Sequence, residues 1–188
     1  MTTQPRWRGV NHLALITPDM DATVRFYHGV LGMRLVTTLA VGRMRHYFFE
    51  IGDGTTLAFF EWKGYEQPTF EKPAGLPPDF PAQFDHVSFT LPDEAALDAL
   101  AARLTEHDVE VTKVVDHRFV RSIYFHDNNG IALEASWWLA DPTGREATYE
   151  GELWTDPDPV PAVRELATSG ELEWTPSTHL APAHWSKS

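Results

Sequence analysis

The 188-residue chain contains no cysteine. This absence excludes disulfide bonds, iron–sulfur clusters, thiolate zinc sites and a cysteine nucleophile. Any metal ion that the protein binds must therefore be held by nitrogen and oxygen ligands.

Basic residues and long apolar runs are also scarce. Lys and Arg together number 15 against 27 Asp and Glu, which gives a formal net charge of −12. Nucleic-acid binding depends on basic residues that neutralise phosphates, so this balance argues against a nucleic-acid partner. No run approaches the ~18 apolar residues that span a bilayer, and the opening MTTQPRWRGV lacks the apolar stretch of a signal peptide. We therefore expect a soluble, cytoplasmic protein without a membrane partner.

What the chain does contain is an internal repeat. His12 in VNHLALITPDMDA recurs as His86 in FDHVSFTLPDEAA, a spacing of 86 − 12 = 74 residues, and the Pro-Asp pair of each segment recurs at the same spacing. A spacing of 76 residues continues the match further along, relating Gly54 to Gly130, Leu57 to Leu133 and Trp62 to Trp138. The repeat favours two related modules.

One difference between the two copies points to a metal site. The alignment places Glu134 opposite Ala58, so the carboxylate occurs in one half only, whereas the histidine occurs in both. His12, His86 and Glu134 form a 2-His-1-carboxylate set, the ligand type of open non-haem Fe(II) sites. Burying an unpaired Glu carboxylate in an apolar strand would destabilise the fold by several kcal/mol. A cation next to the carboxylate would offset this penalty.

Each half shows the pattern β-α-β-β-β. Strand-forming runs end at turn residues, and in both halves a Pro-Asp pair precedes apolar residues at helical spacing. In the first half, residues 8–62, we expect strands at 10–17, 34–41, 45–51 and 56–62, with a helix from 19 to 31. In the second half, residues 84–138, we expect strands at 85–91, 110–115, 121–126 and 131–138, with a helix at 94–107.

Two segments lie outside the modules. Residues 63–83 include five prolines between 63 and 81 and are expected to form a linker or a lid over the site. Residues 139–188 form a C-terminal extension with six of the fourteen prolines, a helical patch at 160–167 and three tryptophans, Trp154, Trp174 and Trp185. The tryptophans indicate that the extension packs on its own sheet or on a partner subunit.

The segments NHLAL, FDHVSF and YFHDNNGIALE, in that order, resemble the vicinal oxygen chelate superfamily. This group includes glyoxalase I, the fosfomycin and bleomycin resistance proteins and the type I extradiol dioxygenases. The resemblance covers residues 8–138. It implies an α+β fold in which two β-α-β-β-β modules form a cup-shaped mixed sheet, with the metal bound by the first and last strands of each module. Those positions are His12, Ala58, His86 and Glu134 in this chain.

The alanine separates the subgroups of the superfamily. Glyoxalase I has a further ligand where this chain has Ala58, whereas extradiol dioxygenases use three ligands. Glu61 is the nearest substitute, but it lies three residues beyond Ala58 and should therefore face away from the cup. The resemblance thus implies one divalent metal, Fe(II) first and Mn, Co, Zn or Ni as alternatives. Three ligands leave room for two oxygens of a catechol-like diol and for O₂.

Further side chains are candidates for proton transfer and substrate binding. Tyr124 stands ten residues before Glu134, where similar extradiol enzymes have an active-site tyrosine, and His117 is an acid/base candidate because imidazole titrates near neutral pH. His46 and Trp138 are candidates for substrate contacts. The alternatives are structural: Tyr124 as a cross-strand aromatic, His117 as a surface cap, Trp137 and Trp138 as sheet packing on opposite faces, and Arg118 or Arg121 as the partner of Glu134.

The sequence therefore predicts an Fe(II) extradiol-type ring-cleaving dioxygenase that acts on an aromatic diol and O₂. A glyoxalase-type metal-dependent lyase or isomerase is the first alternative. A non-catalytic protein that sequesters a small molecule or drug is the second. The resemblance also allows a homodimer, because members of the superfamily often associate.

Overall fold

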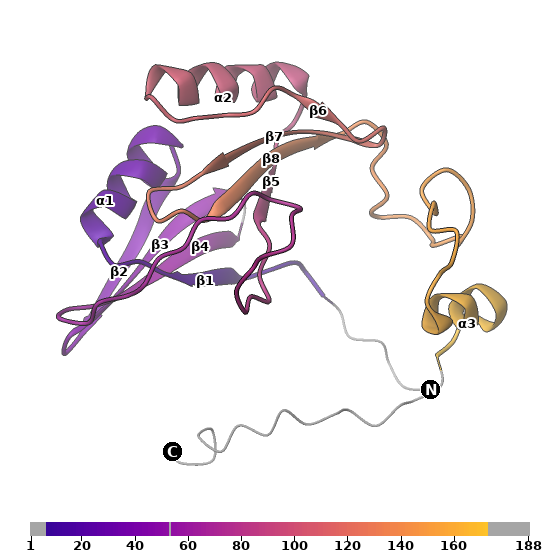
Figure 1. The fold of residues 1–188 in the computed structure, drawn as a ribbon, viewed down its shortest axis with the longest axis horizontal. Helices are drawn as coiled ribbons and strands as arrows, with labels where there is room; N and C mark the ends of the chain where they lie inside the picture. Colours follow the sequence, from indigo (N-terminus) through magenta and orange to yellow (C-terminus); the bar gives the residue numbers. More distant parts are fainter. Residues whose placement is uncertain (1–6, 53, 173–188) are drawn as a thin grey trace, which may run out of the picture. The chain divides into compact units, whose positions relative to one another are not determined.

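The computed structural model describes residues 7–52 and 54–172. The chain divides into two compact units, Met1–Asp141 and Pro142–Ser188, and the two units are described separately. The first unit contains both expected modules, drawn from indigo to orange in Figure 1. No helix in the described ranges has the length and apolar character needed to cross a bilayer.

The first module forms a four-stranded mixed sheet, here called sheet A. Its strands follow the order β1-β4-β3-β2, with β1 parallel to β4 and the other pairs antiparallel. Its elements are β1 (His12–Ile16), α1 (Met20–Val24), the π-helical turn η1 (Arg25–Val30), β2 (Arg34–Val41), β3 (Met44–Gly52) and β4 (Thr55–Trp62).

The second module repeats this plan in sheet B. The order is β5-β8-β7-β6, again with the first and last strands of the module parallel. Its elements are β5 (Val87–Thr90), α2 (Glu94–Glu106), β6 (Val115–Asp116), β7 (Val120–His126) and β8 (Ala132–Trp138). The expected α+β fold of two β-α-β-β-β modules is therefore confirmed, with the strands in two separate sheets.

The repeated Pro-Asp pair explains why a helix follows the first strand of each module. The Asp19 carboxylate accepts the Ala22 N–H at 3.0 Å, and the Asp93 carboxylate accepts the Ala96 N–H at 2.8 Å. Each aspartate therefore caps a helix N-terminus by satisfying a backbone donor that has no partner within the helix. After η1, Gly32 adopts a φ of +74°, a conformation that glycine tolerates best, and the chain turns into β2.

One expected strand is largely absent. Residues 110–115 contribute only an isolated bridge between Val111 and Phe125 and the start of the short β6. The Thr112 N–H donates to the Tyr124 carbonyl oxygen at 3.0 Å, but the returning Tyr124 N–H is accepted at 3.0 Å by the Thr112 hydroxyl and not by a backbone carbonyl. The expectation of a full strand was wrong here because a side chain takes over the role of the neighbouring backbone.

The helix-bearing faces of both sheets share one hydrophobic core. It includes Tyr27 and Phe59 from the first module and Leu97, Ile123 and Leu133 from the second, all 0% exposed. The Tyr27 hydroxyl donates to Asp127 at 2.9 Å across the junction. The opposite, helix-free face of each sheet therefore points away from this core.

The second unit contains α3 (Pro161–Ser169), which overlaps the expected helical patch. Pro161 stands in its first turn, and Gly170 ends it with a φ of +74°. Trp154 packs its ring against Tyr149 at a centroid distance of 5.1 Å. Trp174 and Trp185 lie outside the described residues.

Candidate metal and substrate site

Strand register places two of the predicted residues, Tyr124 and Glu134, side by side on the helix-free face of sheet B. Glu134 of β8 pairs with Ser88 of β5 on one side and with Tyr124 of β7 on the other. Directly paired residues project from the same face, so these three side chains are neighbours. The residue that follows Glu134, Ala135, is fully buried in the core on the other face.

Glu134 is the centre of this group and is only 7% exposed. Its Oε1 accepts hydrogen bonds from the hydroxyls of Ser122 and Tyr124, the latter at 3.2 Å, and its Oε2 lies 2.9 Å from Nε2 of His86. Arg121 pairs instead with Asp116 and Glu94. Arg121 is therefore not the cation that accompanies Glu134.

His86 is held from its other side. Its Nδ1 lies 2.5 Å from Asp85 Oδ1. The Asp85 carboxylate also accepts a hydrogen bond from the Lys72 ammonium at 2.7 Å and one from the Gly75 N–H at 2.8 Å. Lys72, then the Gly75 amide and then His86 hold the pKa of Asp85 well below its ordinary value. Asp85 is therefore an ionised acceptor that faces the ring of His86.

Tyr124 and His117 complete a continuous polar chain. Nε2 of His117 lies 2.9 Å from the Tyr124 hydroxyl, which in turn donates to Glu134. Burial, followed by the charge of Glu134, raises the pKa of Tyr124 above its ordinary value. Tyr124 and His117 therefore contact each other and lie next to two of the predicted ligands, His86 and Glu134, while their acid/base roles stay predictions.

His12 lies on sheet A, apart from this group. It is exposed, its Nδ1 is 2.8 Å from Asn11 Oδ1, and its ring packs edge-on against Phe48 at 5.6 Å. Within the described part of one chain, no three His, Asp or Glu side chains gather closely enough to hold a metal ion. The three predicted ligands therefore do not meet inside a single copy, and their joint use stays a prediction.

Ala58 and Glu61 occupy opposite faces of β4, as the spacing predicts. Ala58 pairs with Phe48 on the helix-free face, where it is fully buried. Glu61 lies on the helix side of β4. Its carboxylate accepts hydrogen bonds there from the Met20 N–H at 3.0 Å and from the Arg45 guanidinium at 2.6 Å. Glu61 therefore fixes the start of α1.

His46 shares the helix-free face of sheet A with His12. Its ring stacks on Phe60 at 3.6 Å and lies 6.3 Å from the ring of His12. Burial, followed by the nearby His12, lowers the pKa of His46, and its buried Nε2 has no hydrogen-bond partner among the described residues. His46 is thus a neutral imidazole with a free polar atom on the predicted substrate side of the module.

The two tryptophans at the end of β8 project in opposite directions. Trp138 pairs in register with Val120 and stacks on Phe119 at 6.0 Å. Trp137 packs against the hydrophobic core. The predicted alternation is confirmed, and it leaves Trp138 on the same face as Glu134.

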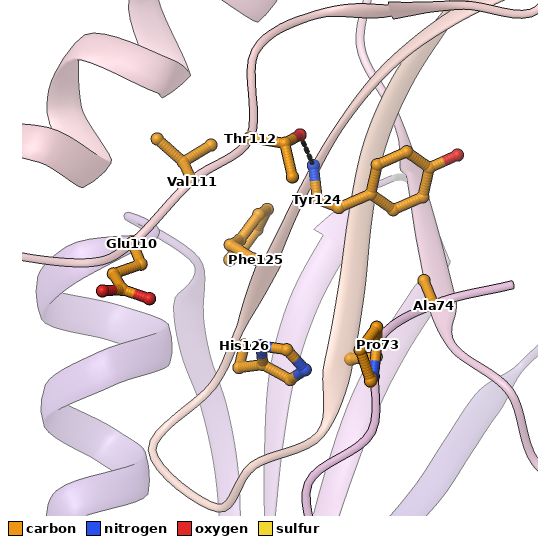
Figure 2. A pocket seen from close by; sticks show the side chains of 9 residues that line it. Pro73, Ala74, Glu110, Val111, Thr112, Tyr124, Phe125 and His126 are labelled. Atoms are coloured by element: carbon orange, nitrogen blue, oxygen red, sulfur yellow. Dashed lines mark hydrogen bonds between the residues drawn. The ribbon is translucent and has the colours of Figure 1, made fainter. Parts of the chain in front are cut away.

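A cavity of about 480 Å³ adjoins Tyr124. Figure 2 shows lining residues from β7, from the stretch around Thr112, and from the segment between the modules, which contributes Pro73 and Ala74; Ala132 of β8 completes the lining. His126 forms part of the wall, and its Nε2 lies 3.0 Å from the Lys72 carbonyl oxygen. Residues 73–74 therefore shape the space beside Tyr124.

Comparison with known proteins identifies the family. The sequence model of the glyoxalase/bleomycin resistance protein/dioxygenase superfamily matches residues 9–144. The chain belongs to this superfamily. Its members are generally dependent on a divalent metal, bind small molecules and often form dimers.

Solved structures of the superfamily share the fold. A glyoxylase/bleomycin resistance protein/dioxygenase domain from Frankia sp. EAN1pec is 23% identical with a TM-score of 0.61, over 71% of this chain and 99% of that chain. Lactoylglutathione lyase from Agrobacterium tumefaciens is 24% identical with a TM-score of 0.53, over 71% and 96%. TnmS3, an antibiotic-binding protein from Streptomyces sp. CB03234, is 18% identical with a TM-score of 0.55, over 72% and 99%. At these identities the likeness concerns the fold.

Sequence reasoning missed three contributors to this site: Ser122, Asp85 and Lys72. Ser122 precedes Tyr124 by two residues and so shares its face, which strand alternation could have revealed. Asp85 directly precedes the repeated histidine, as Asn11 does in the first module. Lys72 left no signal, because it comes from an irregular segment whose path has no periodicity.

Proposed function

We propose that the protein is a divalent-metal enzyme in which His86 and Glu134 of one copy and His12 of a second copy hold one cation. In this proposal it is an Fe(II) extradiol-type dioxygenase that opens a catechol-like ring. The observation that carries the proposal is the pairing of the half-buried His86, through Nε2, with Oε2 of the buried Glu134 at 2.9 Å on a polar patch of sheet B.

The spacing of these two atoms suits a shared metal ion. Ligand atoms at about 2.1 Å from one ion and at right angles to each other lie about 3.0 Å apart. The observed 2.9 Å between Nε2 and Oε2 agrees with adjacent positions on one ion. The donor set of imidazole and carboxylate suits Fe(II) and also Mn, Co, Zn or Ni.

A second copy can supply the missing ligand. His12 is exposed on the helix-free face of its module, and His86 with Glu134 occupies the equivalent face of the other module. In a two-fold symmetric pair, each contact occurs twice, so one dimer would contain two equal sites. The unpartnered Nε2 of His46 lies beside His12 and would then face the shared site.

The proposed chemistry divides between the cation and the protein. A bound divalent cation supplies a fixed positive charge that orients two adjacent substrate oxygens and lowers their pKa. The Tyr124 hydroxyl, whose pKa is raised above its already high ordinary value, stays protonated at neutral pH and donates to Glu134 Oε1 at 3.2 Å, next to the position of the cation. His117 is exposed and contacts the same hydroxyl at 2.9 Å, so its Nε2 can exchange a proton between Tyr124 and solvent.

In this proposal the substrate extends from the cation past Tyr124 into the adjoining cavity, whose lining includes Tyr124 but neither His86 nor Glu134. Its volume of about 480 Å³ falls in the range of small-molecule sites, about 300–1,000 Å³. Phe125 and Ala132 contribute apolar surface, and His126 and Thr112 contribute polar atoms. This mixture supports a small aromatic compound with a few polar substituents.

Oxygen uptake tests the reaction class. Protein purified without oxygen and loaded with Fe(II) should consume O₂ in the presence of one or more members of a panel of catechols. Stoichiometric iron without oxygen uptake on any diol would reject the dioxygenase, and isomerisation of a thiohemiacetal would then favour the glyoxalase-type alternative. Tight binding of an aromatic ligand that survives chelation would instead indicate a sequestering protein.

A further inference from the structure

We propose that Asp85 is a positioning residue that orients the ring of His86 for metal binding, and that Lys72 holds Asp85 in place. This inference rests on the proposed function, because it concerns the same histidine. It assigns a role in the site to the segment between the modules, from which Lys72 comes.

The contacts of Asp85 are divided between its two oxygens. Oδ1 faces His86 Nδ1 at 2.5 Å and also accepts the Gly75 N–H at 2.8 Å, whereas Oδ2 accepts the Lys72 ammonium at 2.7 Å. Lys72 is only 6% exposed and also donates to the Pro73 carbonyl at 3.0 Å. The carboxylate therefore cannot turn without losing a contact to a buried cation.

The contact between Asp85 and Nδ1 determines what the other ring nitrogen of His86, Nε2, can do. An ionised carboxylate only accepts hydrogen bonds, so its contact with Nδ1 keeps a proton on that atom. A metal ion would then bind at Nε2, where it would take the place of the direct contact with Glu134 Oε2 at 2.9 Å. Such a carboxylate–histidine pair fixes the ring and raises its strength as a ligand, and its loss costs about 10–100-fold in metal affinity in other proteins.

The repeat provides an internal comparison. Asn11 precedes His12 as Asp85 precedes His86, at the spacing 85 − 11 = 74, and Asn11 Oδ1 lies 2.8 Å from His12 Nδ1. Both histidines are thus oriented by the preceding side chain. The first module uses a neutral amide, whereas the second uses a carboxylate that is itself held by a buried lysine.

Asp116 offers a matched control. Like Asp85, Asp116 accepts one hydrogen bond from a backbone N–H and one from a cationic side chain. The donors are the Arg118 N–H at 2.7 Å and the Arg121 guanidinium at 3.2 Å. The side chains of the two aspartates are similarly exposed, 52% for Asp116 and 45% for Asp85. No hydrogen bond between Asp116 and a histidine ring accompanies these contacts in the described residues, so removal of its carboxylate should leave metal binding unchanged.

The first measurement needs no metal. In metal-free protein labelled with ¹⁵N in histidine, the Nδ1 proton of His86 should exchange slowly with water. Asp85→Ala should abolish this protection, Asp85→Asn should keep part of it because an amide oxygen still accepts, and Asp116→Ala should keep all of it. Unchanged protection in Asp85→Ala would overturn the positioning role.

The second measurement is a titration of each variant with Co(II). Asp85→Ala should weaken Co(II) binding about 10–100-fold, and Lys72→Met and Asp85→Asn should weaken it less. Asp116→Ala should bind as the wild type does. Equal affinity of wild type and Asp85→Ala would overturn the inference.

The two measurements separate this inference from the proposed function. Wild-type protein that binds no Co(II), but loses protection of the His86 proton in Asp85→Ala, would reject the metal enzyme and retain the orienting contact. If Asp85→Ala fails to fold, Asp85→Asn and Lys72→Met carry the same comparison. Wild-type protection and affinity in both of these variants would then overturn the inference.

Discussion

The two modules share a backbone plan but differ on their helix-free faces. Sheet A presents aromatic rings and imidazoles there: His46 contacts both Phe48 and Phe60, and Phe48 pairs with the buried Ala58. Sheet B presents hydroxyls around the buried Glu134. Positions that build the fold are alike in both modules, whereas positions that face the site have diverged.

Some residues in the core and at the helix caps are the same in both modules. Leu57 and Leu133 are both fully buried, and Asp19 and Asp93 both cap a helix. The exchange of Ala58 for Glu134 is accompanied by matching changes, because Phe48 stands where the second module has Tyr124. A carboxylate is tolerated in sheet B because its neighbours donate hydrogen bonds to it.

The largest expected effect comes from His86→Ala. This change should abolish stoichiometric metal binding, measured by metal analysis after dialysis, because a ligand of the proposed site is lost. Glu61→Ala is the control in the other module: it should keep the metal and lower the free energy of unfolding by roughly 1–3 kcal/mol, since it leaves the Met20 N–H and Arg45 without their acceptor. Metal loss in Glu61→Ala instead would show that the first module supplies a carboxylate.

Tyr124→Phe removes a hydroxyl from sheet B and so makes this position like its equivalent in sheet A, Phe48. The turnover number should fall by about 10²–10⁴-fold, while the metal content stays the same, because the hydroxyl acts on protons rather than as a ligand. Steady-state kinetics on the diol identified by oxygen uptake would measure it. Unchanged turnover would assign Tyr124 to packing between strands.

Ala58→Glu would copy the carboxylate of sheet B into sheet A. Ala58 is fully buried beside Phe48, which cannot donate a hydrogen bond, so the new charge should destabilise the protein by about 3–5 kcal/mol in urea unfolding. Ala40→Glu on the exposed edge strand β2 is the control and should change stability by less than about 0.5 kcal/mol. Equal stability of the two variants would mean that sheet A can accommodate the acid.

The smallest effects should be equal in both modules. Asp19→Ala and Asp93→Ala should each lower the free energy of unfolding by about 1 kcal/mol, because each removes one capping hydrogen bond from a carboxylate to the N–H three residues on. Chemical denaturation of the two variants measures the difference between them. If only one of the two variants lost stability, the aspartate of the other module would be a repeated residue that does not stabilise its helix.

The sequence predicts the fold well because the fold depends on local patterns. The Pro-Asp pairs mark both helices, and the alternation of side chains along a strand is enough to place Ala58 and Glu61 on opposite faces of β4. The site is predicted less completely. Spacing along the chain places Tyr124 beside Glu134 but carries no information on how the two modules pack, and their packing through the helix-bearing faces keeps His12 away from His86.

Complementation between copies tests the central claim most directly. His12→Ala and His86→Ala should each bind no metal alone, since each lacks one ligand in every site. When the two variants are unfolded together and refolded as a mixture, random pairing makes half of the dimers mixed, and each mixed dimer has one intact site of two, so metal binding should return to about a quarter of the wild-type level. A mixture that binds no metal, or a His12→Ala variant that binds it fully alone, would contradict a site shared between two copies.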